Sequence, residues 1–251
     1  MVRAIMHGCN GFMGKVITEL VAEDPEIEIV AGIDIFAEQR YGYPVFAKAA
    51  DCNVEADVLI DFSSAKATDA LLEFVVDRQI PAVLCSTGLS KEQLEAVEEA
   101  SKKVAILKSA NMSLGINTLF KVLKMVAPIL AAEGFDMEIV EKHHRRKVDA
   151  PSGTAIALAD AINESLDNAY NYKFDRTQER KPREKMDIGF AAVRGGTIVG
   201  EHDVIFAGTD EVITISHSAA SRTIFAKGAI AGAKYLAGKP AGHYDMQDVI
   251  G

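Results

Sequence analysis

The stretch VRAIMHGCNGFMG, residues 2–14, predicts how this chain begins to fold. Its first six residues read as a mostly apolar strand, and three glycines spaced three apart follow at once: Gly8, Gly11 and Gly14. A helix is expected next, because apolar side chains recur at helical spacing at Met13, Val16, Ile17 and Leu20. Strand, glycine turn and helix form the context of a dinucleotide-binding loop. The spacing is G-x-x-G-x-x-G and not G-x-G-x-x-G, so a tight turn without a ligand stays open.

A second strand supports the cofactor interpretation. Residues 28–34 (EIVAGID) are mostly apolar and end in Asp34, about twenty residues beyond the last glycine, where an acid accepts hydrogen bonds from the adenosine ribose. An acid that merely caps a turn is the alternative. Asn10 holds the middle position of the glycine turn, where asparagine can adopt a left-handed conformation. Ile35 follows Asp34 and the first cation is Arg40, so we expect NADH to serve at least as well as NADPH.

Further strands and helices alternate through the first half of the chain, as in a parallel sheet. We expect strands at residues 58–62, 80–85 and 104–107, with helices at 65–77 and 91–102. Right-handed crossovers bring the loops that follow the strands to one edge of the sheet. These loops read SSAK (63–66), CSTG (85–88) and SANMS (109–113), and their short side chains suit a nicotinamide approached by backbone. Ordinary helix caps are the alternative.

The second half predicts a different domain. An amphipathic helix at residues 114–132 marks the change, and a further helix ends near Leu166. The charged segment 168–187 is expected to be a solvated loop in which Arg176, Arg180 or Lys181 can touch a neighbouring subunit. Three strands separated by glycine turns (188–193, 203–206 and 211–217), a helix (222–236) and a tail with Pro and Gly follow. We expect a sheet with helices on one face.

The stretch EKHHRRKVDAPSGTA, Glu141–Ala155, carries the most chemistry. Pro151 is suited to a first helical turn and Ser152 to its cap, so backbone N–H groups near Gly153 and Thr154 would point at an anion such as a carboxylate. The same stretch supplies a proton donor in His143 or His144 and a positive charge in Lys147. It therefore predicts a site for a small anionic substrate whose reaction needs protons.

Composition limits the other possibilities. A chain of 251 residues suffices for two modest domains, and 49% hydrophobic with 25% charged residues is ordinary for a soluble protein. Neither a signal peptide nor a sufficiently long apolar run is evident, so we expect no membrane contact. The net charge of −9 disfavours nucleic-acid binding. Cys9, Cys52 and Cys85 lack metal-ligand spacing, which favours a reducing cytoplasm and no structural metal.

Several of these motifs together resemble the 4-hydroxy-tetrahydrodipicolinate reductase (dihydrodipicolinate reductase) family. The resemblance is carried by GCNGFMG, STG, SANMS, EKHHRRKVDAPSGTA, RGGTIVGEH, SRTIFAKGAI and YDMQDV. It implies an α/β protein: a Rossmann-type nucleotide-binding domain (residues 1–112 and 222–251) and an inserted α+β domain (113–221) that binds substrate and forms a homotetramer. It further implies hydride transfer from NADH or NADPH to a cyclic imine dicarboxylate, giving tetrahydrodipicolinate and water in lysine and diaminopimelate biosynthesis.

The resemblance also assigns roles to residues. His143 matches the family's proton donor and acceptor, Lys147 its second proton donor, and His144, Gly153 and Thr154 its substrate contacts. The cofactor site corresponds to Gly8, Cys9, Asn10, Gly11, Phe12, Met13, Asp34, Cys85, Ser86, Thr87, Ser109, Ala110, Asn111 and Met112. Two positions depart from the family pattern. Cys85 and Ser86 stand where Gly and Thr are common, and Ile35 stands where some members carry Arg for the NADPH phosphate.

Other functions remain as alternatives. Another NAD(P)-dependent oxidoreductase of a small carboxylate would share the same loops, including an aldehyde dehydrogenase with Cys85 as nucleophile, although no histidine base follows in a recognisable context. The second alternative is a non-enzymatic protein that senses a nucleotide. The absence of a helix-turn-helix pattern argues against it. A metal site on His143 and His144 is a third, opposed by the absence of a partner at ligand spacing.

Overall fold

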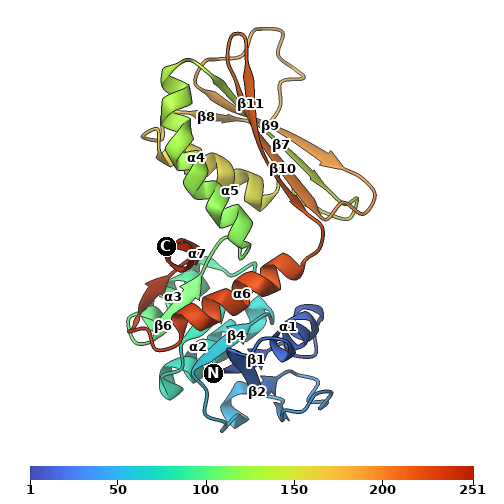
Figure 1. Ribbon diagram of the computed structural model, residues 1–251, viewed down its shortest axis with the longest axis vertical. Coiled ribbons are helices and arrows are strands. Elements are labelled where there is room, and N and C mark those ends of the chain that lie inside the picture. The colour runs from blue at the N-terminus through green and yellow to red at the C-terminus, as the bar shows by residue number, and fades with distance from the viewer. The chain divides into compact units, whose positions relative to one another are not determined.

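The computed structural model describes all 251 residues, and they form two compact units (Figure 1). The first unit comprises Met1–Leu114 and Thr223–Gly251, and the second comprises Gly115–Arg222. The first unit therefore uses both ends of the chain.

The first unit is built on a seven-stranded sheet whose neighbouring strands are all parallel. The strand order is β12-β6-β5-β4-β1-β2-β3. The order reverses between β1 and β4, and ligands of open parallel sheets bind outside the carboxyl ends of the strands at such a point. The strands are β1 Val2–His7, β2 Ile27–Ile33, β3 Val45–Phe46, β4 Val58–Asp61, β5 Ala82–Leu84, β6 Ala105–Lys108 and β12 Gly242–Tyr244.

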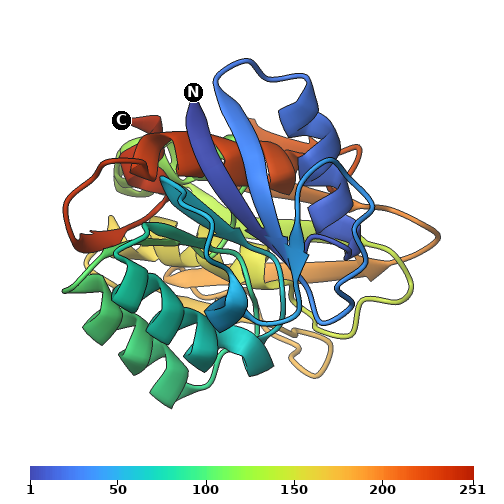
Figure 2. The same ribbon diagram turned by 90° about the horizontal axis from the view of Figure 1, so that it is seen from below.

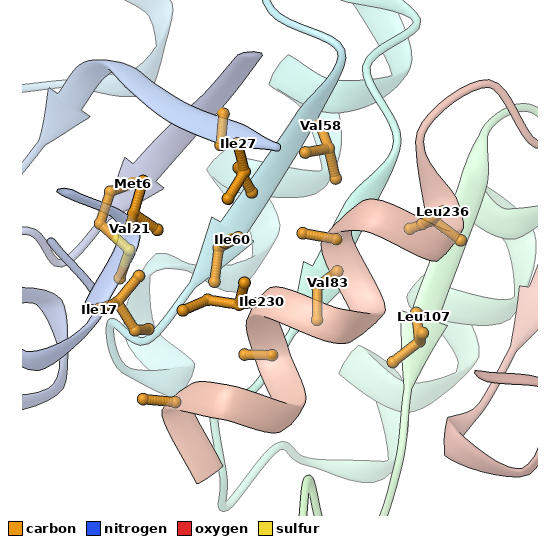
Figure 3. Packing of buried hydrophobic residues seen from close by; sticks show 14 of the residues in the cluster. Met6, Ile17, Val21, Ile27, Val58, Ile60, Val83, Leu107, Ile230 and Leu236 are labelled. Atoms are coloured by element: carbon orange, nitrogen blue, oxygen red, sulfur yellow. The ribbon is translucent and has the colours of Figure 1, made fainter. Parts of the chain in front are cut away.

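Helices cover both faces of this sheet (Figure 2). On one face lie α1 (Phe12–Ala22) and α6 (Thr223–Leu236), and on the other α2 (Thr68–Arg78) and α3 (Lys91–Ser101). Figure 3 shows Ile230 and Leu236 of α6 over the apolar side chains of the central strands. Short helices complete the unit: η1 Ala49–Asp51, η2 Ala65–Ala67 and α7 Met246–Ile250.

The close approach of α6 to Met112 gives a stability prediction. A Cβ on Gly228 would stand 1.6 Å from the Met112 carbonyl oxygen, whereas a Cβ on Gly232, one turn later, would meet Leu107 Cδ1 at 3.3 Å. Gly228→Ala is expected to lower the free energy of unfolding by about 3 kcal/mol, because the helix must move away from backbone. Gly232→Ala should stay within about 1 kcal/mol, since helix propensity favours alanine. Urea unfolding measures both variants, and equal midpoints would contradict the close packing at Gly228.

The second unit is a mixed five-stranded sheet with two helices on one face (Figure 1). The strand order is β11-β10-β7-β9-β8, with β7, β9 and β8 parallel and β10 antiparallel to its neighbours. The elements are α4 Leu114–Ala132, β7 Asp136–His143, α5 Gly153–Glu164, β8 Asn171–Lys173, β9 Asp187–Arg194, β10 Gly200–Ala207 and β11 Val212–Ala219.

Strand β7 alternates strictly between its two faces. Met137, Ile139, Glu141 and His143 are buried, and the residues between them are half-buried. Met137 and Ile139 pack in a core cluster with the apolar faces of α4 and α5. Because side chains two apart share a face of a strand, Glu141 and His143 continue this inward row beyond the apolar core.

The predicted fold class is confirmed: a Rossmann-type parallel sheet with helices, plus a second mixed sheet. Two local predictions were wrong. The charged segment expected to be a solvated loop contains β8, and its Arg176 pairs with Glu138 and Asp187 of the same chain. The expected C-terminal tail contains β12, which extends the parallel sheet beside β6, and α7.

Helix α4 is long and apolar enough to cross a membrane by length and composition, contrary to the expectation that no apolar run reaches that length. Its buried side chains, including Leu119, Leu123 and Ala127, belong to the core cluster beneath the mixed sheet. Packing within the second unit thus buries part of the apolar surface of α4, while Met125 and Ile129 stay exposed.

Candidate active site and its cofactor-binding loops

The Glu141–Ala155 stretch links the end of β7 to the start of α5. Ser152 is the N-cap of α5, and its hydroxyl oxygen accepts the backbone N–H of Ala155 at 3.1 Å. The predicted cap is therefore confirmed. The helix begins at Gly153, so the expectation that Pro151 occupies its first turn was wrong: Pro151 lies before the cap.

Glu141 is the buried centre of this region, with 1% of its surface exposed. Its carboxylate accepts hydrogen bonds from both Arg194 terminal nitrogens at 2.6 and 2.7 Å, from the Ser152 backbone N–H and from His143 Nδ1. Burial by itself raises the pKa of the Glu141 carboxyl, but these hydrogen bonds outweigh it and hold the pKa below its usual range. Glu141 is therefore an anion in this structure.

The ionised carboxylate sets the protonation of His143. His143 Nδ1 lies 2.6 Å from Glu141 Oε2, and a carboxylate can only accept, so Nδ1 carries the proton. In the neutral ring, Nε2 is then the nitrogen that takes up or releases a proton. Burial lowers the pKa of His143, and Glu141 offsets part of that effect. A Cβ on Gly200 would lie 3.0 Å from His143 Nε2, so glycine at this position leaves room for the ring.

His202 is a second buried imidazole beside His143. The two rings meet edge to face with centroids 5.2 Å apart, and His202 Nε2 lies 3.0 Å from the hydroxyl of Ser152. Burial, reinforced by the charge of His143, lowers the pKa of His202 to about 4. His202 is therefore neutral near pH 7 and lies between His143 and the cap of α5.

Lys147 lies in the loop between β7 and α5. Its Nζ is 2.9 Å from Asp149 Oδ1, and the hydrogen bond from Lys147 chiefly holds the pKa of Asp149 below its usual range, with a smaller contribution from the Gly153 backbone N–H. Gly153 itself is exposed, and a Cβ there would meet nothing within 4 Å. An anion can thus approach the backbone at the start of α5.

The predicted substrate residues lie at the two ends of the β7–α5 connection, and Glu141 joins these ends through its hydrogen bonds with His143 and the Ser152 N–H. His143 ends β7, His144 follows it, and Gly153 and Thr154 form the first turn of α5. Sequence reasoning assigned no role to Glu141, Arg194 or His202, although the period-two pattern of β7 extends to Glu141 and RGGTIVGEH contains the other two.

The glycine turn of the first unit has the form that a dinucleotide needs. Gly8 has φ +81°, and a Cβ on it would lie 2.7 Å from the Phe62 carbonyl oxygen. A Cβ on Gly14 would lie 2.2 Å from the Gly8 carbonyl oxygen. Gly11 caps α1 without a side-chain bond. The left-handed residue of the turn is thus Gly8, and the expectation for Asn10 was wrong.

Asp34 lies at the carboxyl end of β2 and connects the glycine turn after β1 with the loop after β2. Its carboxylate accepts the backbone N–H of Asn10 at 3.0 Å and that of Phe36 at 3.0 Å. The Asn10 side chain donates in turn to the Phe36 and Glu38 carbonyls. A cavity of about 340 Å³ opens here, at the switch point between β1 and β4, and is lined by Gly8, Asn10, Asp34, Ile35, Phe62 and Ser63 among others. These residues fit a dinucleotide.

The other predicted cofactor residues lie on neighbouring loops. Phe12 is exposed, Met13 packs against the core and the Cys9 side chain is fully buried, which leaves only its backbone for a ligand. Ser86 donates to Asp61 at 2.5 Å, and Ser109 accepts the Met246 N–H. Burial raises the pKa of the Cys85 thiol well above its ordinary range, which disfavours Cys85 as a nucleophile. Thr87 and residues 110–112 lie on the loops after β5 and β6.

Comparisons with known proteins assign the family. Residues 2–112 match the family described as "Dihydrodipicolinate reductase, N-terminus", and residues 115–250 match "Dihydrodipicolinate reductase, C-terminus". The 4-hydroxy-tetrahydrodipicolinate reductase of Caldanaerobacter subterraneus subsp. tengcongensis is 53% identical over 253 residues, covering 100% of this chain and 98% of the relative. That of Clostridium novyi is 48% identical over 250 residues, with the same coverage.

Solved structures support the fold. A dipicolinate-bound dihydrodipicolinate reductase from Paenisporosarcina sp. TG-14 superposes with a TM-score of 0.80 at 22% identity, covering 100% of this chain and 99% of that chain. A probable dehydrogenase from Thermotoga maritima reaches 0.60 at 13% identity, covering 99% and 92%. Together with the sequence matches, which span both halves of the chain, these findings lead to one conclusion: the chain belongs to the dihydrodipicolinate reductase family.

Proposed function

We propose that this chain is a 4-hydroxy-tetrahydrodipicolinate reductase, an oxidoreductase of lysine and diaminopimelate biosynthesis that uses NADH or NADPH. Family membership supports the reaction. The observation that carries the proposal is the Glu141–His143 pair beside the start of α5, because it places an acid–base imidazole next to an anion-binding helix terminus. The experiment is to follow nicotinamide oxidation spectroscopically with substrate generated in place by the upstream synthase.

The second unit would hold the dicarboxylate. Lys147 and the Gly153 backbone N–H, which interact with Asp149 in this structure, would turn to one carboxylate of the substrate, and Thr154 would add a hydroxyl in the same helical turn. His144 would supply a further contact at the end of β7. A small dianion fits these groups, since both fixed charge and backbone dipoles favour it.

The first unit would hold the cofactor through its glycine turn, Asp34 and the loops after β5 and β6. When bound, the reduced nicotinamide supplies the hydride. Loss of water from the 4-hydroxy substrate gives a conjugated C=C–C=N system. Addition of a hydride to this system places electron density on the imine nitrogen and on the carbon next to the imine carbon, and that carbon must then receive a proton. Protonated His143 would deliver it from Nε2, while Glu141 holds Nδ1–H. Lys147 would act as a second proton donor.

We also propose that the chain assembles as a homotetramer through the second unit. The face of the mixed sheet opposite α4 and α5 keeps apolar side chains exposed, including Val193 on β9 and Val212 on β11. An extended apolar sheet face favours association with another copy.

The cavity beside Asp34 predicts the cofactor preference. Ile35 is 82% exposed at its edge, and Arg40, the nearest cation in sequence, is paired with Glu38 at 2.6 Å. Residues 34–40 therefore supply no unpaired cation for the 2′-phosphate of NADPH. We expect the KM for NADH to be equal to or lower than the KM for NADPH. Steady-state kinetics with each cofactor measures this.

A pair of variants sharpens the cofactor comparison. Ile35→Arg should lower the KM for NADPH by about tenfold, the value of one charge-assisted contact, and leave that for NADH nearly unchanged. Ile35→Gln is the control of similar length without charge and should leave both constants near the parent values. A strong NADPH preference in the unmodified chain would contradict the prediction.

A further inference from the structure

Each oxygen of the Glu141 carboxylate accepts two hydrogen bonds. Oε2 accepts from His143 Nδ1 at 2.6 Å and from Arg194 at 2.7 Å. Oε1 accepts from the Ser152 N–H at 3.0 Å and from the other Arg194 terminal nitrogen at 2.6 Å. These donors come from the end of β7, the end of β9 and the cap of α5, so a single side chain connects the segments that carry the proposed acid and the proposed anion site.

The fold itself does not call for a carboxylate here. Position 141 continues the inward row of Met137 and Ile139, where an apolar side chain would pack without a partner. Burying a charge is costly unless it is paired and hydrogen-bonded. An ionised Glu141 with Arg194 as its bidentate partner is therefore better explained by what it does to His143 than by packing.

We infer that Glu141 is a positioning residue that fixes His143 with its proton on Nδ1 and stabilises the protonated ring, while Arg194 limits how strongly it does so. The inference rests on the proposed function for the destination of the proton. The coupling between Glu141 and His143 does not depend on that function.

The charges around His143 determine the sign of the effect. Glu141 on the same strand favours the imidazolium, whereas Lys147 in the following loop and Arg194 on β9 disfavour it. His202 on β10 faces the ring in its neutral form. Removing the carboxylate should therefore lower the pKa of His143, and removing the guanidinium should raise it.

The test is an NMR titration of the histidine ring carbons in the ligand-free protein. The chain has six histidines, and the His143 signal is identified by its loss in His143→Ala. Glu141→Gln is expected to lower the His143 midpoint by about one pH unit or more, and Arg194→Gln to raise it by about half a unit. With substrate, Glu141→Gln should lower kcat by about tenfold to a thousandfold and change KM by less than about threefold, because the misplaced ring affects proton delivery.

Asp187→Asn is the matched control. Asp187 is a buried carboxylate at the other end of β9 and pairs with Arg176, away from His143. Asp187→Asn should lower thermal stability as Glu141→Gln does. It should leave the titration midpoint of His143 and the kcat unchanged. If Glu141→Gln does not fold, the upward shift in Arg194→Gln still tests the coupling.

Opposite shifts in the two variants support the inference. Unchanged midpoints, shifts of the same sign, or an equal shift in Asp187→Asn overturn it. A parent chain without reductase activity that nevertheless shows the opposite shifts would refute the proposed function and leave the coupling intact.

Discussion

Alanine at position 143 is expected to lower kcat by about a hundredfold to ten-thousandfold while the substrate KM changes by less than about threefold. In the proposed function the ring contributes a proton in the transition state, and the groups proposed to bind the carboxylate, Lys147 and Gly153, lie outside the ring. The side chain is only 11% exposed, so water reaches its position poorly and replaces the donor inefficiently. Steady-state kinetics with the synthase-generated substrate separates the two constants.

The same variant should also lose the basic limb of the pH profile. Burial lowers the pKa of His143 in the ligand-free protein, so the protonated ring, and with it turnover, declines as pH rises through that lowered pKa. His243→Ala serves as the control for the loss of an imidazole, since His243 pairs with Glu98 in the first unit. It should keep both kcat and the profile. Turnover within tenfold of the parent in His143→Ala would remove His143 from the proton step.

Much of the fold follows from local patterns in the sequence. The run from Val2 to Gly14 predicts strand, turn and helix correctly, because a strand followed directly by Gly8, which has φ +81°, has few other continuations. Helix α4 and the cap at Ser152 are equally local, since each depends on residues within a few turns of one another. Short-range patterns of this kind can be recognised in a single sequence.

The partners of His143 could not be predicted in the same way. Arg194 reaches Glu141 because β9 pairs with β7 in parallel, with His143 opposite Arg194. His202 stands opposite Glu141 because β10 pairs with β7 in the antiparallel sense. Both registers join segments more than fifty residues apart, and nothing in the local pattern specifies them. The sequence therefore predicts His143 as the acid and Ser152 as the helix cap. The place of the Glu141 carboxylate between them becomes clear only when the pairing of the strands is known.

The charged segment between α5 and β9 shows a second limit. Its composition resembles a solvated loop, yet Tyr172 in β8 packs on Phe190 of β9 and Arg183 pairs with Asp136. Three residues are too short for a period-two pattern, and a long cationic side chain can cover apolar surface while its charge finds a partner. Composition alone consequently overestimates how exposed such a segment is.

Replacing Lys147 with alanine is expected to raise the substrate KM by about tenfold to a hundredfold and to lower kcat by about tenfold as well. The variant removes a cation from the proposed carboxylate site, and it also leaves Asp149 without its partner 2.9 Å away. The unpaired carboxylate then repels a dianion at the start of α5. The loop should keep its place, because Arg194 donates to the Asp149 carbonyl oxygen at 2.7 Å independently of Lys147.

Two further variants identify which loss matters. Lys142→Ala is the matched control: Lys142 lies on the opposite face of β7 and pairs with Glu201 and Asp203, so it should leave both constants near the parent values. Adding Asp149→Asn to Lys147→Ala should recover part of the KM, since it removes the repelling charge without restoring the cation. If the double variant binds no better than Lys147→Ala, Asp149 does not oppose the substrate. If Lys142→Ala weakens binding equally, the general charge of the unit, and not a contact from Lys147, attracts the dianion.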